Sequence, residues 1–259
     1  MSRKTVSLII FSVIIEIMLE KFSKKDKNFL FDAHFHYAVC REHGLDIPVS
    51  EDGLQWTGIS CAHSTEEYEV QSKAPQSVIQ SYGMHPQNAA YENIKESADF
   101  LESLLRENKL SFIGEAGFDY FSQEFRNAAL LQEEIWNIQL DLALKYNLPL
   151  VVHCRKANEK LFEYSKQLKK LPEVLFHSFM GMPAEALSLC RRGINAYFSF
   201  GKQVMNGNKK VIACVRELPD QVLLTETDAP FQYLKGENYT APSDIEKIRD
   251  AFIDLRSQS

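Results

Sequence analysis

The feature that most constrains this sequence is a series of apolar segments, most of which end at their carboxyl-terminal side in histidine, glutamate or aspartate. Strands that are buried on both faces read as nearly continuous apolar runs, and amphipathic stretches separate most of these segments. Such alternation is typical of βαβ units and a parallel sheet. The candidate strands are residues 28–35, 56–63, 78–85, 111–118, 149–155, 173–179, 195–201 and 221–228.

The length of the chain selects one architecture for these strands. A (β/α)8 barrel typically takes about 250 residues, and this chain has 259. We therefore predict an α/β fold, a single-domain (β/α)8 TIM-type barrel over residues 28–259. The clearest helix covers residues 124–147, where apolar residues recur at helical spacing and Asn147 and Pro149 end the run. Because active sites of these barrels lie at the carboxyl ends of the strands, the polar strand ends predict the functional site.

Residues 1–27 form an N-terminal extension to this barrel. The apolar run at residues 6–19 is shorter than the roughly 20 residues of a spanning helix and contains Glu16. No small-residue cleavage site follows it. We interpret the extension as a peripheral helix, an over-long start with Met18 as the true initiator, or a weak signal-like segment, and we expect no stable membrane partner. A membrane anchor or an uncleaved signal is the alternative.

Charge and cysteine content narrow the functional classes. The formal net charge of −6 argues against a wide electrostatic grip on nucleic acid, which needs a basic surface. A nucleic-acid substrate would have to be held locally, by metal and a few basic side chains. The five cysteines are scattered and form no CxxC pair, which argues against a disulfide framework or a zinc ribbon and favours a reducing cytoplasm.

The first candidate strand ends in two histidines, His34 and His36. Side chains alternate along a strand, so both imidazoles project to the same side and could chelate one metal ion. The alternative to a metal site is a pair of core or solvent-exposed histidines without a functional role. Asp32 lies on the same side, where we expect a structural or supporting role.

A glutamate and an aspartate mark the fourth strand. Glu115 follows the apolar pair Phe112–Ile113, and a carboxylate buried at that place needs a cation. Glu115 could therefore bridge two metal ions. We expect Asp119 to be a cap or turn residue.

The fifth strand carries His153, Cys154 and Arg155 at its end. His153 and Arg155 share one side of the strand and can face the barrel mouth, whereas Cys154 points to the helices. This geometry argues against Cys154 as a nucleophile.

Two further strand ends complete the candidate site. His177 alone would be interpreted as a satisfied core histidine, but its combination with the other strand-end residues favours a metal site. Asp228 ends the last strand beside Pro230, where a carboxylate can ligate metal and orient or deprotonate an attacking water. Glu226 lies deeper, where we expect a structural or supporting role.

Taken in order, these segments resemble the TatD-type metal-dependent deoxyribonucleases of the amidohydrolase-like barrel superfamily. The resemblance covers about residues 29–232 and rests on HxH, G-M-H-P, G-E-A-G-F-D-Y, V-V-H-C-R-K-A, F-H-S-F-M-G and T-E-T-D-A-P. It implies catalytic roles for Asp228 and Glu115 and substrate-binding roles for His85 and Arg155. The metal ligands that it implies are His34, His36, Glu115, His153, His177 and Asp228.

The resemblance also implies a reaction. It implies two divalent metal ions (Mg, Mn or Zn) and hydrolysis of DNA phosphodiester bonds, with single-stranded DNA as the preferred substrate and 3'-5' exonuclease action. On this hypothesis, one ion is held by His34, His36 and Asp228. The other is held by His153 and His177, and Glu115 bridges the two.

Two departures from the family pattern concern the substrate. Gln87 stands where the family's G-x-H-P-H segment ends in histidine, and the loop after Asp228 carries only Lys235 in place of an arginine-containing stretch. A metal-dependent hydrolase of a small amide, lactone or phosphoester on the same barrel is therefore kept as the alternative function. A non-catalytic scaffold on a decayed barrel predicts lost ligands, and no ligand is lost here.

Overall fold

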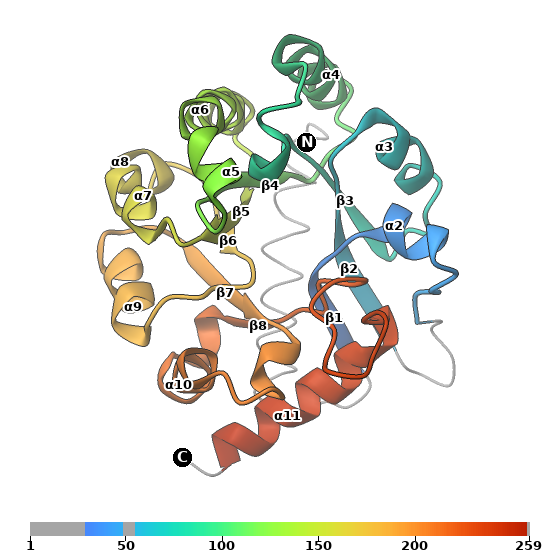
Figure 1. The fold of residues 1–259 in the computed structure, drawn as a ribbon, viewed down its shortest axis with the longest axis vertical. Helices are drawn as coiled ribbons and strands as arrows, with labels where there is room; N and C mark the ends of the chain where they lie inside the picture. The colour runs from blue at the N-terminus through green and yellow to red at the C-terminus, as the bar shows by residue number, and fades with distance from the viewer. Residues whose placement is uncertain (1–28, 49–54, 258–259) are drawn as a thin grey trace, which may run out of the picture.

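The computed structural model describes residues 29–48 and 55–257, which form a parallel barrel whose eight strands follow one another in chain order (Figure 1). Every candidate strand of the sequence overlaps one of them, so the predicted (β/α)8 barrel is confirmed. The strands are β1 (Phe29–Phe35), β2 (Gln55–Ala62), β3 (Val78–Tyr82), β4 (Phe112–Asp119), β5 (Leu150–Arg155), β6 (Val174–Phe176), β7 (Ala196–Phe200) and β8 (Leu223–Thr225).

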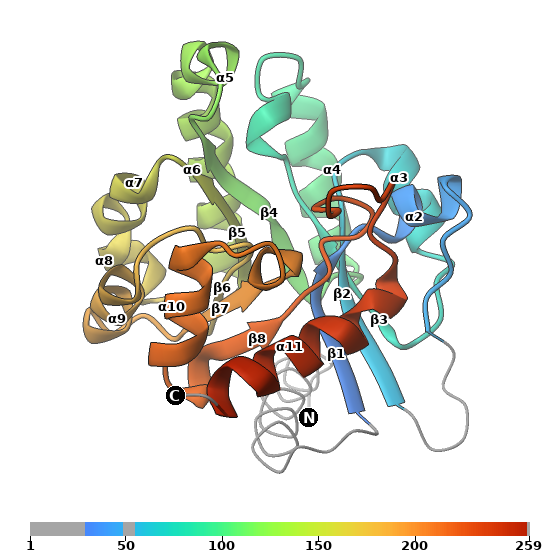
Figure 2. The same cartoon turned by 60° about the horizontal axis from the view of Figure 1, so that its bottom comes forward.

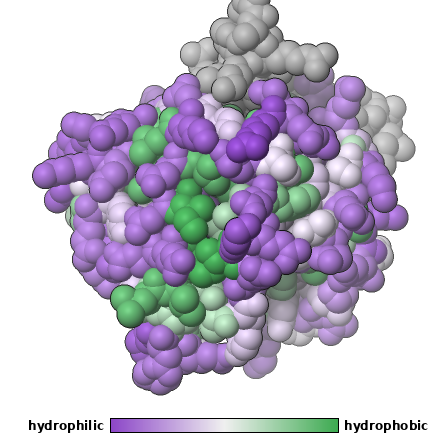
Figure 3. Space-filling model, turned by 90° about the horizontal axis from the view of Figure 1, so that it is seen from above, coloured by the Kyte–Doolittle hydropathy of each residue, from purple (hydrophilic) through white to green (hydrophobic). Residues whose placement is uncertain are grey.

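The helices lie outside the strands in both ribbon views (Figures 1 and 2). They are α2 (Tyr37–Glu42), α3 (Thr65–Gln71), α4 (Ile94–Arg106), α5 (Gln123–Asn127), α6 (Ala129–Tyr146), α7 (Asn158–Glu163), α8 (Ser165–Leu168), α9 (Pro183–Arg191), α10 (Lys209–Glu217) and α11 (Ile245–Ser257). Short 3-10 turns are η1 (Pro86–Asn88), η2 (Lys202–Val204), η3 (Asp220–Val222) and η4 (Pro242–Asp244). On the face shown in Figure 3, hydrophilic side chains surround a narrow hydrophobic band, as expected where amphipathic helices turn their polar sides outward.

The helix predicted over residues 124–147 is divided in the structure. Ala128 separates α5 from α6, and Ser122 caps α5 by accepting a hydrogen bond from the Phe125 backbone N–H. The predicted end is confirmed, because Asn147 has the left-handed φ of 52° that commonly closes a helix.

Apolar side chains fill two layers. Those that point into the barrel form a small cluster around Phe31, Phe112 and Val151, while those that point outward form a larger cluster with the helices. Cys154 belongs to the larger cluster, as expected from its place on β5, and burial raises the pKa of its thiol. A thiol held in this way is a poor nucleophile.

Glycines bring β4 unusually close to β5. Gly117 has a φ of +147°, and a Cβ there would lie 1.9 Å from the His153 carbonyl oxygen. Gly114 has a φ of +137°, and a Cβ there would lie 2.4 Å from the Val151 carbonyl oxygen. Only residues without side chains fit here, and this close approach places Glu115 beside His153.

Side chains help to close the barrel between β8 and β1. The buried carboxylate of Asp32 accepts hydrogen bonds from the Thr227 hydroxyl at 2.6 Å and the Thr227 backbone N–H at 2.8 Å. Next to this pair, the Asp228 backbone N–H donates to the His34 carbonyl oxygen at 2.9 Å. Burial raises the pKa of Asp32 to about 7 despite these donors. Asp32 thus has the structural role expected of it, and it joins β1, which carries His34, to the segment after β8 that carries Asp228.

The predictions for residues 1–27 lie outside the described residues. Within residues 29–48 and 55–257, no helix has both the length and the apolar character needed to cross a membrane.

The barrel closure is testable at Thr227. Thr227→Val keeps the shape of the side chain but removes the hydroxyl donor from a buried carboxylate, so we expect a loss of about 1–3 kcal/mol in the free energy of unfolding. Denaturant unfolding in EDTA measures this loss without a contribution from bound metal. Thr227→Ser keeps the hydroxyl and should unfold close to wild type; equal stability of the valine variant would contradict the role given to this hydrogen bond.

Candidate metal centre

A cavity of about 640 Å³ opens among the loops and strand ends that carry the predicted site residues. Its wall combines titratable side chains from the barrel with polar side chains from the loops. His34 is fully buried and does not border the cavity. The predicted site residues that line it are His36, His85, Glu115, His153, Arg155, His177 and Asp228.

Glu115 lies at the centre of this site, with only 2% of the residue exposed. Six of the chain's seven histidines place a ring nitrogen within 3.5 Å of its two carboxylate oxygens. Oε1 is approached by His34, His36 and His63, at 3.1, 3.4 and 3.1 Å. Oε2 is approached by His85, His153 and His177, at 3.5, 3.3 and 2.6 Å.

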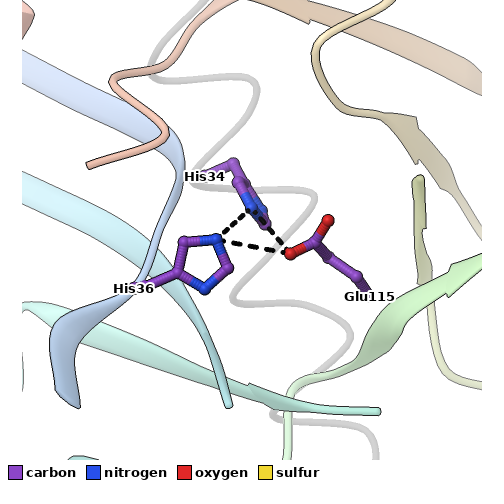
Figure 4. A group of neighbouring side chains, drawn as sticks. All are labelled: His34, His36 and Glu115. Carbon is purple, nitrogen blue, oxygen red and sulfur yellow. Dashed lines mark hydrogen bonds and ion pairs between the residues drawn. The ribbon is translucent and has the colours of Figure 1, made fainter. Parts of the chain in front are cut away.

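Figure 4 shows how β1 and β4 bring His34, His36 and Glu115 together, with the two imidazoles pointing toward the carboxylate. The Nε2 atoms of the two histidines are 3.2 Å apart, as the alternation of side chains predicted, although β1 ends at Phe35 and His36 directly follows it. The seventh histidine, His43, instead stacks on Tyr239 with ring centroids 4.2 Å apart.

The electrostatics of the centre favour metal binding. Burial alone would raise the pKa of Glu115, but the surrounding His177, His34 and His85 hold it well below its ordinary value. Burial, with the neighbouring His177, lowers the pKa of His34 to about 4. The centre therefore presents an ionised carboxylate together with at least one neutral imidazole, and metal ions bind these forms.

Asp228 completes the side of the centre formed by His34 and His36. Its Oδ1 lies 3.3 Å from the Nε2 of His36 and 3.6 Å from that of His34. Its Oδ2 accepts a hydrogen bond from the side-chain amide of Gln232 at 2.5 Å. Burial would raise the pKa of Asp228, but the hydrogen bond from His36 and the nearby histidines lower it. The carboxylate is thus held from both ends, with one oxygen facing the histidines.

Asp119 orients His153. Its Oδ2 lies 3.1 Å from the Nε2 of His153 and also accepts a hydrogen bond from the Gln87 amide at 2.8 Å. Burial would lower the pKa of His153, but the hydrogen bonds with Asp119 and Glu115 raise it to about 9. A carboxylate at Nε2 keeps the proton on that nitrogen and leaves Nδ1 to face Glu115. The expected turn role of Asp119 is also present, since its Oδ1 accepts the Phe121 backbone N–H at 2.8 Å.

His85 has the opposite arrangement. The Gln87 backbone N–H donates to its Nδ1 at 3.2 Å, and burial lowers its pKa to about 3. The ring is therefore neutral, and its single proton lies on Nε2, the nitrogen that faces the centre. His85 presents a hydrogen-bond donor to the site, whereas His153 turns Nδ1 toward Glu115 and can offer that nitrogen to a metal ion once it is deprotonated.

Arg155 lies at the border of the cavity and is itself exposed. Its guanidinium carbon is 3.6 Å from the centroid of the Phe121 ring, and the Lys156 ammonium is 4.7 Å from the same centroid. Stacking on the ring restricts the guanidinium. Among the described residues that line the cavity, Arg155 is the only lysine or arginine.

The residues present fit divalent metal ions. Three groups of donor atoms in the described residues lie within 4.8 Å of one another: His34, His36 and Glu115; His34, His177 and Asp228; and His85, Glu115 and His153. Nitrogen and oxygen ligands at about 2.0–2.2 Å from one ion lie roughly 3 Å from each other, which matches the spacings around Glu115. Mixed imidazole and carboxylate donors suit several divalent metals.

Two residues of this site were not predicted from the sequence. His63 follows the apolar run of β2 directly, so the rule that marked the other strand-end histidines could also have found it. Gln232 lies in the loop after β8 with a left-handed φ of 54°. No sequence pattern marked it, because its contact with Asp228 depends on the path of that loop.

A parallel barrel with a buried carboxylate and imidazoles gathered at its strand ends defines a class of metal-dependent hydrolases. The model of one family in this class, described as TatD related DNase, matches residues 31–259. The chain therefore belongs to the TatD related DNase family and is a metal-dependent hydrolase that acts on ester bonds.

Individual relatives agree with this assignment. An uncharacterised metal-dependent hydrolase of Mycoplasma genitalium is 30% identical over 215 residues, which cover 78% of this chain and 80% of that protein. A protein named 3'-5' ssDNA/RNA exonuclease TatD, from Edwardsiella piscicida, is 29% identical over 197 residues, which cover 75% of this chain and 72% of that protein. The solved structure of a TatD homologue from Escherichia coli has the same fold, with a TM-score of 0.75 and 24% identity over 87% of this chain and 90% of that one.

The support that Asp119 gives to His153 is testable by metal binding. Asp119→Ala removes the carboxylate that fixes the proton on Nε2 and frees the ring to turn, so we expect metal affinity to fall about 10- to 100-fold. Titration of the metal-free protein against a chelating indicator measures the affinity. Glu124→Ala is the control, because this exposed carboxylate accepts a hydrogen bond from the Tyr91 hydroxyl and does not line the cavity. Unchanged affinity in Asp119→Ala would rule out the orienting role.

Proposed function

We propose that this protein hydrolyses DNA phosphodiester bonds, with single-stranded DNA as its preferred substrate and release of nucleotides from the 3' end. The observation that carries the proposal is the buried carboxylate of Glu115, which histidines approach on both of its oxygens. A relative within the same family bears the name of a 3'-5' ssDNA/RNA exonuclease, and this name supports both the substrate class and the direction.

We propose two divalent ions, Mg, Mn or Zn, as cofactors. His34, His36 and Asp228 would hold one ion, His153 and His177 would hold the other, and Glu115 would be shared between them. The spacing of these donors supports this division, because Asp228 lies beside the first histidine pair and the second pair meets the opposite oxygen of Glu115.

When bound, such ions supply Lewis acidity toward the phosphoryl group and acidify a water molecule. The protein's own residues then position the reaction. Asp228 receives the proton of the attacking water, and its Oδ1 is the oxygen that faces the site, because Gln232 occupies Oδ2. Glu115 remains ionised during the reaction and keeps the two groups of histidines in their positions around its two oxygens.

We assign binding of the phosphoryl oxygens to His85 and Arg155. His85 offers a neutral N–H on the wall of the cavity, and Arg155 offers a guanidinium at its border. Donors placed where negative charge develops stabilise the transition state of phosphoryl transfer.

The preference for single strands rests on the character of the cavity wall. Phe231 is 47% exposed, lines the cavity and lies edge-on to His36, with ring centroids 5.0 Å apart. An unstacked base can stack on such a ring, whereas a paired base cannot reach it. Because Arg155 is the only lysine or arginine among the described residues of the wall and the net charge is −6, we expect binding to be local to the scissile nucleotide.

We assign hydrolysis to the barrel over residues 28–259, apart from the extension at residues 1–27. Five free cysteines agree with the reducing environment of the cytoplasm, where we place the protein.

The proposed function is tested with an end-labelled single-stranded oligonucleotide in Mg, Mn or Zn. We expect metal-dependent shortening from the 3' end, abolished by EDTA, and slower degradation of the matching duplex. Small esters and lactones assayed in parallel test the alternative function; their hydrolysis without any cleavage of DNA would overturn the proposal.

Asp228→Asn tests the proposed acceptor of the proton. We expect kcat to fall by at least 100-fold, because the amide neither accepts the proton nor supplies an anionic ligand. The melting temperature in EDTA should change little. Asp99→Asn, at an exposed carboxylate on α4 paired with Lys95, is the matched control; full metal-dependent activity in Asp228→Asn would exclude the role given to Asp228.

Arg155→Ala tests the proposed phosphoryl contact at the cavity border. Loss of one hydrogen bond to a charged oxygen costs about 1.5–3 kcal/mol, so we expect kcat/KM on single-stranded DNA to fall about 10- to 100-fold. Lys156→Ala removes the neighbouring cation over Phe121. Because Lys156 does not line the cavity, this variant should retain most of the activity. Equal losses in the two variants would indicate a general electrostatic effect and contradict a specific contact.

A further inference from the structure

We propose that His63 binds the substrate, donating a hydrogen bond from its imidazole to a non-bridging oxygen of the phosphoryl group, as a partner of His85. This inference rests on the proposed function and adds to it a residue that neither the family pattern nor the strand-end argument had assigned.

The backbone holds His63 at the site. It follows β2, and its backbone N–H donates to the Glu67 carboxylate at 2.7 Å. Ser64 then caps α3 by accepting the Glu67 backbone N–H at 3.2 Å. The position of His63 is thus set by the start of a helix, and its Nε2 lies 3.1 Å from Oε1 of Glu115.

His63 and His85 form a third pair of histidines around Glu115. Their rings meet edge to face, with centroids 4.9 Å apart. Each side chain is 12% exposed, which is close to the 14% of His153 and above the 0% of His34 and the 3% of His177. Both rings also line the cavity. The pair therefore lies on the side of Glu115 that a substrate can reach.

The surroundings of this pair differ from those of the two proposed metal-binding pairs. His34 and His36 have Asp228 within 3.6 Å, and His153 has Asp119 at 3.1 Å. Among the described residues, the side-chain nitrogens of His63 and His85 form ion pairs with no carboxylate other than Glu115. A metal site built from these two rings would lack an anionic ligand of its own.

The donor geometry agrees with this distinction. None of the three groups of described donors that are close enough to share an ion contains His63. One group does contain His85, but the backbone N–H at its Nδ1 keeps the proton on Nε2, and a protonated nitrogen cannot ligate a metal. The pair is thus suited to accept an anion, and an imidazole N–H is a good donor to a phosphoryl oxygen.

The first test separates substrate binding from metal binding. His63→Ala should retain the metal content of wild type, measured by elemental analysis of the purified protein. Its kcat/KM on single-stranded DNA should fall about 10- to 100-fold, as expected for one hydrogen bond to a charged group. His63→Gln, which keeps an N–H donor, should recover part of the loss. His43→Ala is the control, since His43 stacks on Tyr239 outside the centre.

The second test does not depend on cleavage of DNA. Inhibition by inorganic phosphate of the hydrolysis of bis(p-nitrophenyl) phosphate reports on the same phosphoryl subsite. We expect the inhibition constant to rise about tenfold in His63→Ala and to stay unchanged in His43→Ala. If the wild type binds phosphate but does not cleave DNA, the proposed function fails while this inference stands.

Two results would overturn the inference. Loss of bound metal in His63→Ala would make His63 a ligand. An unchanged kcat/KM together with an unchanged inhibition constant for phosphate would leave no contact between His63 and the substrate. Melting temperatures of all variants in EDTA exclude misfolding as the source of either result.

Discussion

The architecture of the site depends on one buried carboxylate. Glu115 lies in the middle of β4 with almost no access to solvent, and its negative charge requires compensation. This compensation comes from imidazoles at the ends of five other strands, which point toward the two carboxylate oxygens. Gly114 and Gly117 make this arrangement possible, because they let β4 approach β5 so closely that no side chain would fit between the backbones. The same crowding of donors suits the centre to divalent ions.

The contacts that close the barrel between β8 and β1 also position residues of the metal centre. The short strand β8 ends before Asp228, so the backbone that carries this carboxylate is held by bonds to β1 instead of a continued ladder. Asp32 and Thr227 add two hydrogen bonds to that connection. Because His34 follows Asp32 on β1, a shift between β1 and β8 would separate the carboxylate from the histidines it adjoins. A change that weakens the contacts between β1 and the segment after β8 should therefore also disturb the geometry of the metal centre.

The histidines of the site have different roles, and the hydrogen-bond partner of the ring nitrogen that faces away from the centre distinguishes these roles. His153 meets the Asp119 carboxylate at Nε2 and turns Nδ1 to the centre, where a metal ion can displace the proton, whereas His85 accepts a backbone N–H at Nδ1 and turns the proton on Nε2 to the centre. The first arrangement suits a metal ion and the second an anionic oxygen. Gln87 takes part in both, through its side chain to Asp119 and its backbone to His85. Its presence in place of the family's histidine thus leaves the support of the centre intact.

The sequence by itself determined the barrel and most of the candidate centre. Alternation along a strand and placement at its end are local properties, so the pairing of His34 with His36 and the inward position of Glu115 could be predicted. His63 obeyed the same rule and could have been predicted too. Only the tertiary structure decided which partner each side chain meets, as with Asp119 on His153 and Gln232 on Asp228. Such contacts join different strands and loops, and their distances depend on register and on the path of a loop, which no local pattern encodes.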